Sequence, residues 1–533
     1  MTMSSDFDII IVGSGPAGVS SAFPLVEAGL KVLLVDGGRD STISPPSKPY
    51  LVSRLEDENQ WEWMVGRNYH ALRNMDAVSP KLRAPTHASV FEKFNLFNKI
   101  EPNDFVVVGS LAQGGLSNAW GCGVARLSVE ELRHFPFASS EIEQSYATVT
   151  RRIGVSGGID DDLSQYFGLD QWASPPIQMD NLQSSLLDRY VKRRSKVTSL
   201  GMRLGHSRVA ALSESIGDRH ACDLSGNCLW GCDRRALYAA TEDLRLLIRY
   251  ANFTYKSGFI VEKIIYTEGN PAIFGTDITG KRIFNAKKVI LAAGTIATTK
   301  LALQALNFEK PVAMHSCPTA AFMLWLPAAL GKQRESAFGL GQLSFVLSLP
   351  GEISGFGSLF NPTGISVAEF LRYLPLRKRY GIDFLSALLS SCVVGNIFLP
   401  GNLTTATLSL KANNYLNIEG RYSQKVSSLM HLSEKRLRKA FWKLGAVLLP
   451  KSFTLGKPGS DIHYACSLPM REAPTVGETN ADGALFGIRG IYIADGASLP
   501  ILTEKSHTLT IMANADRIAR KLAQNIALSG GHF

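Results

Sequence analysis

Apolar and polar residues near the start of the chain follow the order strand, helix, strand. Residues 9–12 form an uninterrupted apolar run, which is typical of a parallel strand buried on both faces. Residues 17–28 have a helical pattern, and Gly29 follows as a C-terminal cap. Residues 32–35 predict a second buried strand, with Asp36 directly after it. The pattern therefore predicts a βαβ unit.

Further along the chain the pattern changes twice. Residues 253–288 alternate as strands do, and the apolar run 289–293 predicts a buried strand that leads into a helix. Residues 311–455 are apolar, aromatic and glycine-rich, and we interpret them as most of a second domain.

A glycine pattern, Gly13-x-Gly15-x-x-Gly18, fills the first turn of the βαβ unit. In such turns the first glycine permits the bend, the second lets the backbone approach a pyrophosphate, and the third allows close helix–strand packing. The helix N-terminus then faces the phosphates. Asp36 is placed to hydrogen-bond ribose hydroxyls, and its negative charge disfavours the 2′-phosphate of NADP.

Composition narrows the class of protein. The chain has 533 residues, which is too long for one core and suits two interleaved domains. A hydrophobic content of 45% and a charged content of 19% are ordinary for a soluble globular protein. The first residues lack the basic segment of a signal peptide, and no apolar run reaches membrane-spanning length. Seven cysteines suit a reduced compartment, so we expect a cytoplasmic protein.

The net charge of +10 has more than one interpretation. It favours solubility, or attraction to an anionic substrate or membrane surface. No dense basic run with interleaved aromatics is present, so nucleic acid is not an expected partner. The strip 371–380 mixes aromatic and basic residues, and such a strip either contacts a membrane peripherally or forms a core helix beside a solvated turn.

Both ends of the chain and a middle block at 289–303 resemble the glucose-methanol-choline (GMC) oxidoreductases, flavoenzymes that oxidise alcohols. The segments that carry the resemblance are the glycine fingerprint, the loop Gly114-Gly115-Leu116-Ser117, the segment 490–500 with Asp495, His463, and Ser506-His507-Thr508. The resemblance is nearest to the sugar-oxidising members, pyranose oxidases and bacterial sugar dehydrogenases, through a helix and turn within 141–157. It is weak at 311–450.

The resemblance implies an α/β fold that is α+β overall. A Rossmann-like FAD-binding domain would comprise residues 6–155, 206–310 and 456–529. It would be interleaved with a substrate-binding domain, residues 156–205 and 311–455, built on an antiparallel sheet with helices.

The resemblance also implies FAD as the cofactor. The residues that match FAD-contacting positions are Gly13, Gly15, Gly18, Asp36, Gly114, Gly115, Ser117, Asn118, Ala119, Asp495 and Thr508. Asp495 corresponds to the aspartate that holds the ribityl chain. Relatives that link FAD covalently have a histidine where this chain has Ala119, so we expect FAD to be bound without a covalent bond.

Two histidines match the catalytic pair of the family. Oxidising an alcohol requires loss of a hydroxyl proton, which suits a neutral imidazole. His463 aligns with that base, and His507 aligns with a second site that is histidine in some members and asparagine in others. Alternatively each is an ordinary structural histidine among the ten in the chain, as we expect of His206, His220 and His315.

Three cysteines, Cys222, Cys228 and Cys232, have the spacing of the thiolates that hold a 3Fe–4S cluster in membrane-associated sugar dehydrogenases of the GMC type. Packing of small buried side chains and a zinc site are the alternatives. We expect the other four cysteines to pack in the interior.

The resemblance implies an FAD-dependent oxidoreductase that oxidises a CH–OH group of a sugar, glycoside or polyol. The electron acceptor would be oxygen, a quinone or a cytochrome. One alternative substrate is a lipid-linked or long-chain alcohol at a membrane surface. Two alternative functions are a non-catalytic FAD-fold binding protein and a carbon–carbon lyase on the same scaffold.

Overall fold

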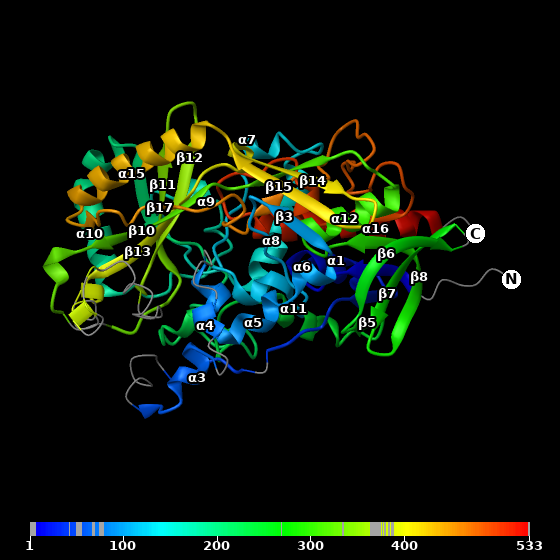
Figure 1. The fold of residues 1–533 in the computed structure, drawn as a ribbon, viewed down its shortest axis with the longest axis horizontal. Coiled ribbons are helices and arrows are strands. Elements are labelled where there is room, and N and C mark those ends of the chain that lie inside the picture. The colour runs from blue at the N-terminus through cyan, green and yellow to red at the C-terminus, as the bar shows by residue number, and fades with distance from the viewer. Residues whose placement is uncertain are drawn as a thin grey trace.

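The computed structural model describes residues 7–41, 43–48, 56–66, 70–73, 79–267, 269–332, 335–362, 375, 377, 380–381, 384 and 388–530. Most of the strip 371–380, and with it the predicted membrane contact, lies outside the described residues. The described strands form three sheets (Figure 1), with the sheet that contains β1 near one end of the molecule and the sheet that contains β10 near the other.

The first sheet is parallel at its centre. Its strands run in the order β5-β2-β1-β8, and β19 pairs with the end of β8. The other half of β8 pairs with β7, which pairs with β6 in an antiparallel meander. The strands are β1 (Phe7–Val12), β2 (Val32–Val35), β5 (Phe253–Lys256), β6 (Ile260–Thr267), β7 (Asn270–Asp277), β8 (Gly280–Leu291) and β19 (Ile491–Ile493). The predicted βαβ unit is confirmed, with α1 (Pro16–Glu27) between β1 and β2.

Both faces of this sheet are covered, which explains the uninterrupted apolar run in β1. Successive residues of a strand point to opposite faces. Ile9 and Ile11 pack in a core with α1, α11 and α16, whereas Ile10 and Val12 pack with the meander and α12. α8 lies against α16 on the helical side. The helices are α8 (Ser140–Ile153), α11 (Ala240–Leu247), α12 (Thr295–Leu306) and α16 (Thr508–Gly530).

The second sheet is antiparallel, in the order β16-β10-β13-β12-β11-β4, with β17 also paired to β10. α10 (Asn181–Thr198) and α15 (Lys425–Lys443) cover one face (Figure 1), and Phe322, Phe345 and Phe441 meet in the core between them. The strands are β4 (Met202–His206), β10 (Thr319–Trp325), β11 (Gly341–Ser348), β12 (Ser354–Phe360), β13 (Cys392–Phe398), β16 (Val447–Leu448) and β17 (Thr454–Leu455).

The third sheet joins distant parts of the chain in the order β18-β9-β14-β15-β3. Its strands are β3 (Ile100–Asn103), β9 (Val312–Ser316), β14 (Thr404–Leu410), β15 (Leu416–Tyr422) and β18 (Tyr464–Ala465). β3 and β18 come from the segments predicted to form the FAD-binding domain, and the other three strands come from the predicted substrate-binding domain. The domain boundaries therefore stay a prediction.

The fold class expected from the sequence is confirmed: a sheet that is parallel at its centre and has covering helices is combined with an antiparallel sheet backed by two helices. The remaining helices are short, and they are α3 (Gln60–Met64), α4 (His70–Arg73), α5 (Ala88–Phe91), α6 (Phe94–Phe97), α7 (Val129–Leu132) and α9 (Ser164–Phe167). Within the described residues, no helix combines the length and the apolar character that crossing a membrane requires.

Candidate active site

Four parallel strands, β1, β2, β8 and β19, end at the same edge of the first sheet. Ligands of open α/β sheets bind in the crevice outside such strand ends. The turns that follow these strands line one cavity of about 1510 Å³, which continues to the antiparallel sheet. A pocket for one drug-sized ligand measures roughly 300–1,000 Å³, so this cavity has room for a dinucleotide and a second molecule.

Two of the three fingerprint glycines, Gly13 and Gly18, leave no space for a side chain, whereas Gly15 leaves space for a ligand. A Cβ on Gly13, whose φ is +106°, would lie 2.3 Å from the carbonyl oxygen of Ala292. A Cβ on Gly18 would lie 1.8 Å from the carbonyl oxygen of Gly13. Gly15 instead faces open space at the start of α1, with no atom within 4 Å of a Cβ built there. Gly13 and Gly15 line the cavity, whereas Gly18 packs the helix onto the strand.

Asp36 lies at the end of β2 and lines the cavity. Its carboxylate accepts hydrogen bonds of 2.8 Å from the Gly38 backbone N–H and from the Tyr255 hydroxyl, and a further one from Ser14. A carboxylate has about four acceptor positions, so one remains for a ribose hydroxyl. Burial raises the pKa of Asp36, and the hydrogen bonds oppose that rise.

The second glycine loop is tied to the first. The Gly114 N–H donates to Ser14 Oγ at 2.9 Å. Ser117 Oγ donates to the Gly114 carbonyl at 2.6 Å and accepts from the Ala240 N–H at 2.8 Å. Ser117 lines the cavity, but its hydroxyl holds the loop together.

Of the remaining residues of this loop, some hold the loop in shape and others line the cavity. Asn118 Nδ2 donates to the carbonyls of Gln113 and Gly115, at 2.7 and 2.9 Å. Gly115 and Ala119 line the cavity, as does Thr508 at the start of α16, whereas Gly114 and Asn118 do not. Asn118 therefore shapes the loop rather than the cavity wall.

Asp495 follows β19 and lines the cavity. Its carboxylate accepts from Thr298 Oγ1 at 2.5 Å, the Gly294 N–H at 2.9 Å and the Ala497 N–H at 3.0 Å. Burial raises the pKa of Asp495 to about 6. These bonds fix the turns after β8 and β19 to one another.

The structure brings His463 and His507 together. Their rings meet edge to face, with centroids 4.8 Å apart and planes at 74°, and both line the cavity. Burial lowers the pKa of His463 to about 4, and the pKa of His507 lies well below 6.5 because of burial and the neighbouring His463. Both rings are therefore neutral at pH 7, as a proton acceptor requires. Neither Nδ1 atom has a hydrogen-bond partner among the described residues.

A carboxylate that the sequence analysis did not single out lies behind this pair. Asp461 Oδ2 is 3.8 Å from His463 Nδ1, and the Asp461 side chain is 0% exposed. The carboxylate accepts from Ser316 Oγ at 2.5 Å and from the Cys317 N–H at 2.6 Å. Burial raises the pKa of Asp461 to about 7. The only hint in the sequence is an aspartate two positions before the histidine.

Cys317, Asp461 and His463 also place one possible metal-ligand atom each within 4.8 Å of one another. In this structure, hydrogen bonds hold Cys317 and Asp461 in place. The Cys317 thiol donates to the Thr503 carbonyl at 3.2 Å, and burial raises its pKa well above 9. A metal would need the thiolate, so these contacts favour a structural role for Cys317.

Ile462, between Asp461 and His463, has a φ of +62°. A β-branched residue in this left-handed region is strained by roughly 1–3 kcal/mol. Flanking contacts hold it there: the Ile462 N–H donates to the Gly459 carbonyl, and the Tyr464 hydroxyl lies 2.8 Å from the Val106 carbonyl oxygen. The backbone is therefore locked immediately before the histidine.

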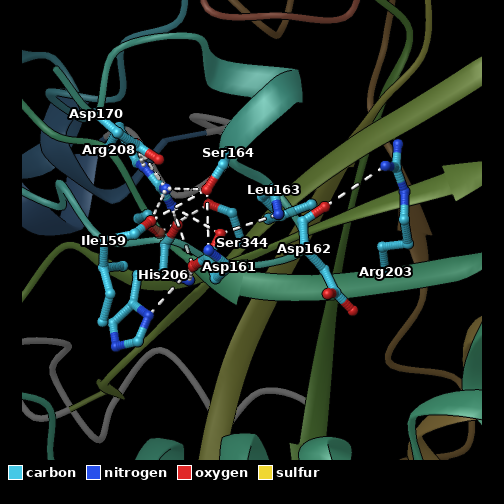
Figure 2. Close-up of polar contacts among 11 residues, drawn as sticks. Ile159, Asp161, Asp162, Leu163, Ser164, Asp170, Arg203, His206, Arg208 and Ser344 are labelled. Carbon is cyan, nitrogen blue, oxygen red and sulfur yellow. Dashed lines mark hydrogen bonds and ion pairs between the residues drawn. The ribbon is translucent and has the colours of Figure 1, made fainter.

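Arg208 lines the cavity with a side chain that is 0% exposed. Figure 2 shows the network that neutralises it: Arg208 donates to Asp170 at 2.7 Å and to Asp161 at 3.1 Å. Asp161 also faces His206 Nδ1 at 3.3 Å, so His206 belongs to this network. A buried cation needs such partners, and here they anchor the segment around 159–170 to the end of β4.

The three cysteines with cluster-like spacing are free in the structure. Cys228 is buried, and its Sγ accepts from the Gly339 N–H at 3.4 Å. Burial raises the pKa of Cys222 to about 11, and the pKa of Cys228 is raised too. The buried Cys228 therefore fits the packing alternative, whereas Cys222 and Cys232 are partly exposed, and these features lend no support to a 3Fe–4S cluster.

Comparisons with known proteins agree with this geometry. Residues 8–74 match the family model described as an FAD binding domain. A 2-methyl-1,2-propanediol dehydrogenase of Mycolicibacterium austroafricanum is 25% identical over 321 residues, which are 58% of this chain and 53% of that protein. The chain thus spans about half the length of this curated relative.

The crystal structure of pyridoxine 4-oxidase from Mesorbium loti has a TM-score of 0.59 at 12% identity, covering 97% of this chain and 99% of that one. This match extends the shared fold over nearly the whole chain. Residues 8–74 are therefore similar to an FAD binding domain, and the chain shares its fold with a known oxidase.

Proposed function

We propose that this chain is an FAD-dependent oxidoreductase that oxidises the CH–OH group of an alcohol. The observation that carries the proposal is the pair of neutral histidine rings, 4.8 Å apart, on a cavity that begins at FAD-binding sequence. The name of the dehydrogenase relative, which acts on a diol, supports an alcohol as substrate.

The cavity residues fit FAD. The open space at Gly15, the N-terminus of α1 and the remaining acceptor position of Asp36 suit the pyrophosphate and ribose. Asp495 and Ala119 lie on the cavity wall at the positions predicted for the ribityl chain and for the loop without a linking histidine. The N-terminus of α16 at Thr508 offers positive dipole charge beside His507.

When bound, FAD supplies the acceptor for the hydride that leaves the carbinol carbon. His463 accepts the proton of the substrate hydroxyl, so that an alcohol becomes a carbonyl compound. Its Nδ1 is buried beside Asp461, which leaves Nε2 as the atom for the proton. A base with a pKa of about 4 is unprotonated over the physiological range.

His507 and Asp461 assist this step. His507 donates a hydrogen bond to the alkoxide oxygen as negative charge develops on it. Asp461 positions His463 through Nδ1, and its negative charge makes Nε2 more basic. The 3.8 Å separation shortens to a hydrogen bond by a small movement, as catalytic contacts of ligand-free enzymes often do.

A sugar, glycoside or polyol is the substrate class that the sequence resemblance favours, with oxygen, a quinone or a cytochrome as acceptor. The purified protein should be mixed without oxygen with sugars, polyols, glycosides and apolar alcohols, and flavin absorbance followed. Bleaching by at least one alcohol is expected. Bound flavin that no alcohol bleaches would favour a binding protein, and carbon–carbon cleavage without bleaching would favour a lyase.

A further inference from the structure

One face of the antiparallel sheet forms the wall of the cavity opposite the nucleotide-binding strands. On β13, Val394, Asn396 and Phe398 line the cavity, whereas Val393 and Ile397 are 0% exposed in the core shared with α10 and α15. The alternation follows from strand geometry. The cavity-facing residues therefore determine what a second molecule meets beyond the histidines.

The row nearest His463 consists of two aromatic rings and one threonine. Phe398 pairs with Phe356 across β13 and β12, and the Phe398 ring centroid lies 5.0 Å from that of His463. Thr319 ends the row on β10, where it pairs with Phe398. We call Phe356 and Phe398 the inner apolar row. A carbinol held by His463 therefore has its neighbouring atoms beside the Phe398 ring, with Phe356 next to that ring on β12.

The next row is polar, and consists of Ser344, Ser358 and Asn396. The Oγ atoms of Ser344 and Ser358 are 3.0 Å apart, and Ser207 Oγ is 2.7 Å from that of Ser344. Asn396 Oδ1 accepts from the Ser358 N–H at 2.9 Å. Asn396 lines the cavity, and no described residue accepts a hydrogen bond from its Nδ2. This row has a hydrogen-bond donor to offer.

A second apolar row, Met323, Val394 and Phe360, follows the polar row. Residues two apart on a strand are separated by roughly 7 Å. The wall thus presents an apolar band beside the reacting carbon, a polar band roughly 7 Å further, and apolar surface beyond that.

From this banding we infer that the substrate is an alcohol whose carbinol carbon bears an aromatic or branched hydrocarbon body, with one further hydrogen-bonding group roughly 7 Å away. The inference rests on the proposed function and names its substrate class, in place of the sugar, glycoside or polyol that the sequence resemblance favours. A sugar has a hydroxyl on each carbon, and the inner apolar row would leave several of them without partners. Asn396 Nδ2 donates to the second polar group.

The test uses the FAD-loaded protein and anaerobic flavin reduction by para-hydroxybenzyl alcohol, para-methylbenzyl alcohol and D-glucose. The two aromatic alcohols have the same shape and differ in the distal hydroxyl. We expect the hydroxyl compound to reduce the flavin fastest, and glucose to be slower by roughly a hundredfold.

Asn396→Ala should lower the rate ratio of the hydroxyl to the methyl compound by roughly threefold to tenfold. The hydroxyl also changes the electronic properties of the ring, but this effect is the same in the variant and the wild type. Comparing the rate ratio between the two proteins therefore removes it. If Asn396→Ala loses FAD, Asn396→Asp tests the same donor, because it keeps the acceptor for Ser358. Its ratio is then measured with para-methoxybenzyl alcohol in place of the hydroxyl compound, since an ether oxygen only accepts and cannot donate to the new carboxylate. Ser348→Ala, on the exposed end of β11, is the control and should keep the ratio.

Faster reduction by glucose than by either aromatic alcohol would overturn this inference and leave the proposed function standing. A ratio that neither Asn396 variant changes would also overturn it. Flavin that no alcohol reduces would overturn the proposed function, and this inference with it.

Discussion

The ring of His507 meets the ring of His463 edge to face at 4.8 Å, although 43 residues separate them in the chain. If His507 steadies the alkoxide, His507→Asn should slow flavin reduction by roughly tenfold or less, because asparagine keeps a donor. His507→Ala should slow it by roughly a hundredfold, the cost of one missing oxyanion donor. Stopped-flow absorbance checks both, and equal rates in the two variants would contradict the role.

Asp461 should appear in the pH profile of flavin reduction. In the wild type the rate rises near pH 4 as His463 loses its proton, and again near pH 7 as Asp461 ionises. Both rises have the same sign because the deprotonated forms are the active ones. The two apparent values belong to the coupled pair.

Asp461→Asn should remove the upper rise and leave the rate at pH 8 roughly tenfold low. The exposed Asp104 supplies the matched control, since Asp104→Asn should keep both rises. If the rise near pH 7 persists in Asp461→Asn, that rise comes from a group other than Asp461.

FAD should be released by acid precipitation of the protein. Ala119 lines the cavity where covalent relatives have a histidine, so no imidazole is available there to link the ring. The supernatant should carry the yellow colour, measured by absorbance and by mass spectrometry of the protein. Flavin that stays with the pellet would contradict this.

Cys228 should behave as a packing residue. Cys228→Ser keeps an acceptor for the Gly339 N–H, so it should cost about 1–2 kcal/mol of unfolding free energy and leave flavin reduction unchanged. Iron and sulfide analysis with low-temperature EPR is the companion measurement. Stoichiometric iron in the wild type that disappears in the variant would revive the cluster interpretation.

The sequence predicts the parts of this fold that depend on the hydrophobic pattern and on contacts between residues close together in the chain. The apolar run in β1 and the glycine turn after it are explained by burial on both faces and by contacts within a few residues. Motif resemblance also places Asp495, His463 and His507, and all three line the cavity.

Contacts between distant segments were not predictable in this way. The Asp461–Ser316 hydrogen bond and the Phe398–His463 contact each join residues from different strands or loops. Ser117 matches a cofactor position, yet its hydroxyl bonds to Gly114 and Ala240, because a loop must satisfy its own polar groups first. The hydrogen-bond and ring partners of these side chains depend on the assembled fold.

The central claim is that His463 takes the proton of an alcohol, and His463→Ala tests it most directly. FAD should stay bound, while anaerobic flavin reduction at pH 7 should slow by roughly a hundredfold or more. The deficit should shrink as pH rises, because alkoxide then forms in solution. His431→Ala, on the exposed side of α15, should reduce its flavin at the wild-type rate. A wild-type rate in His463→Ala at pH 7 would contradict the account.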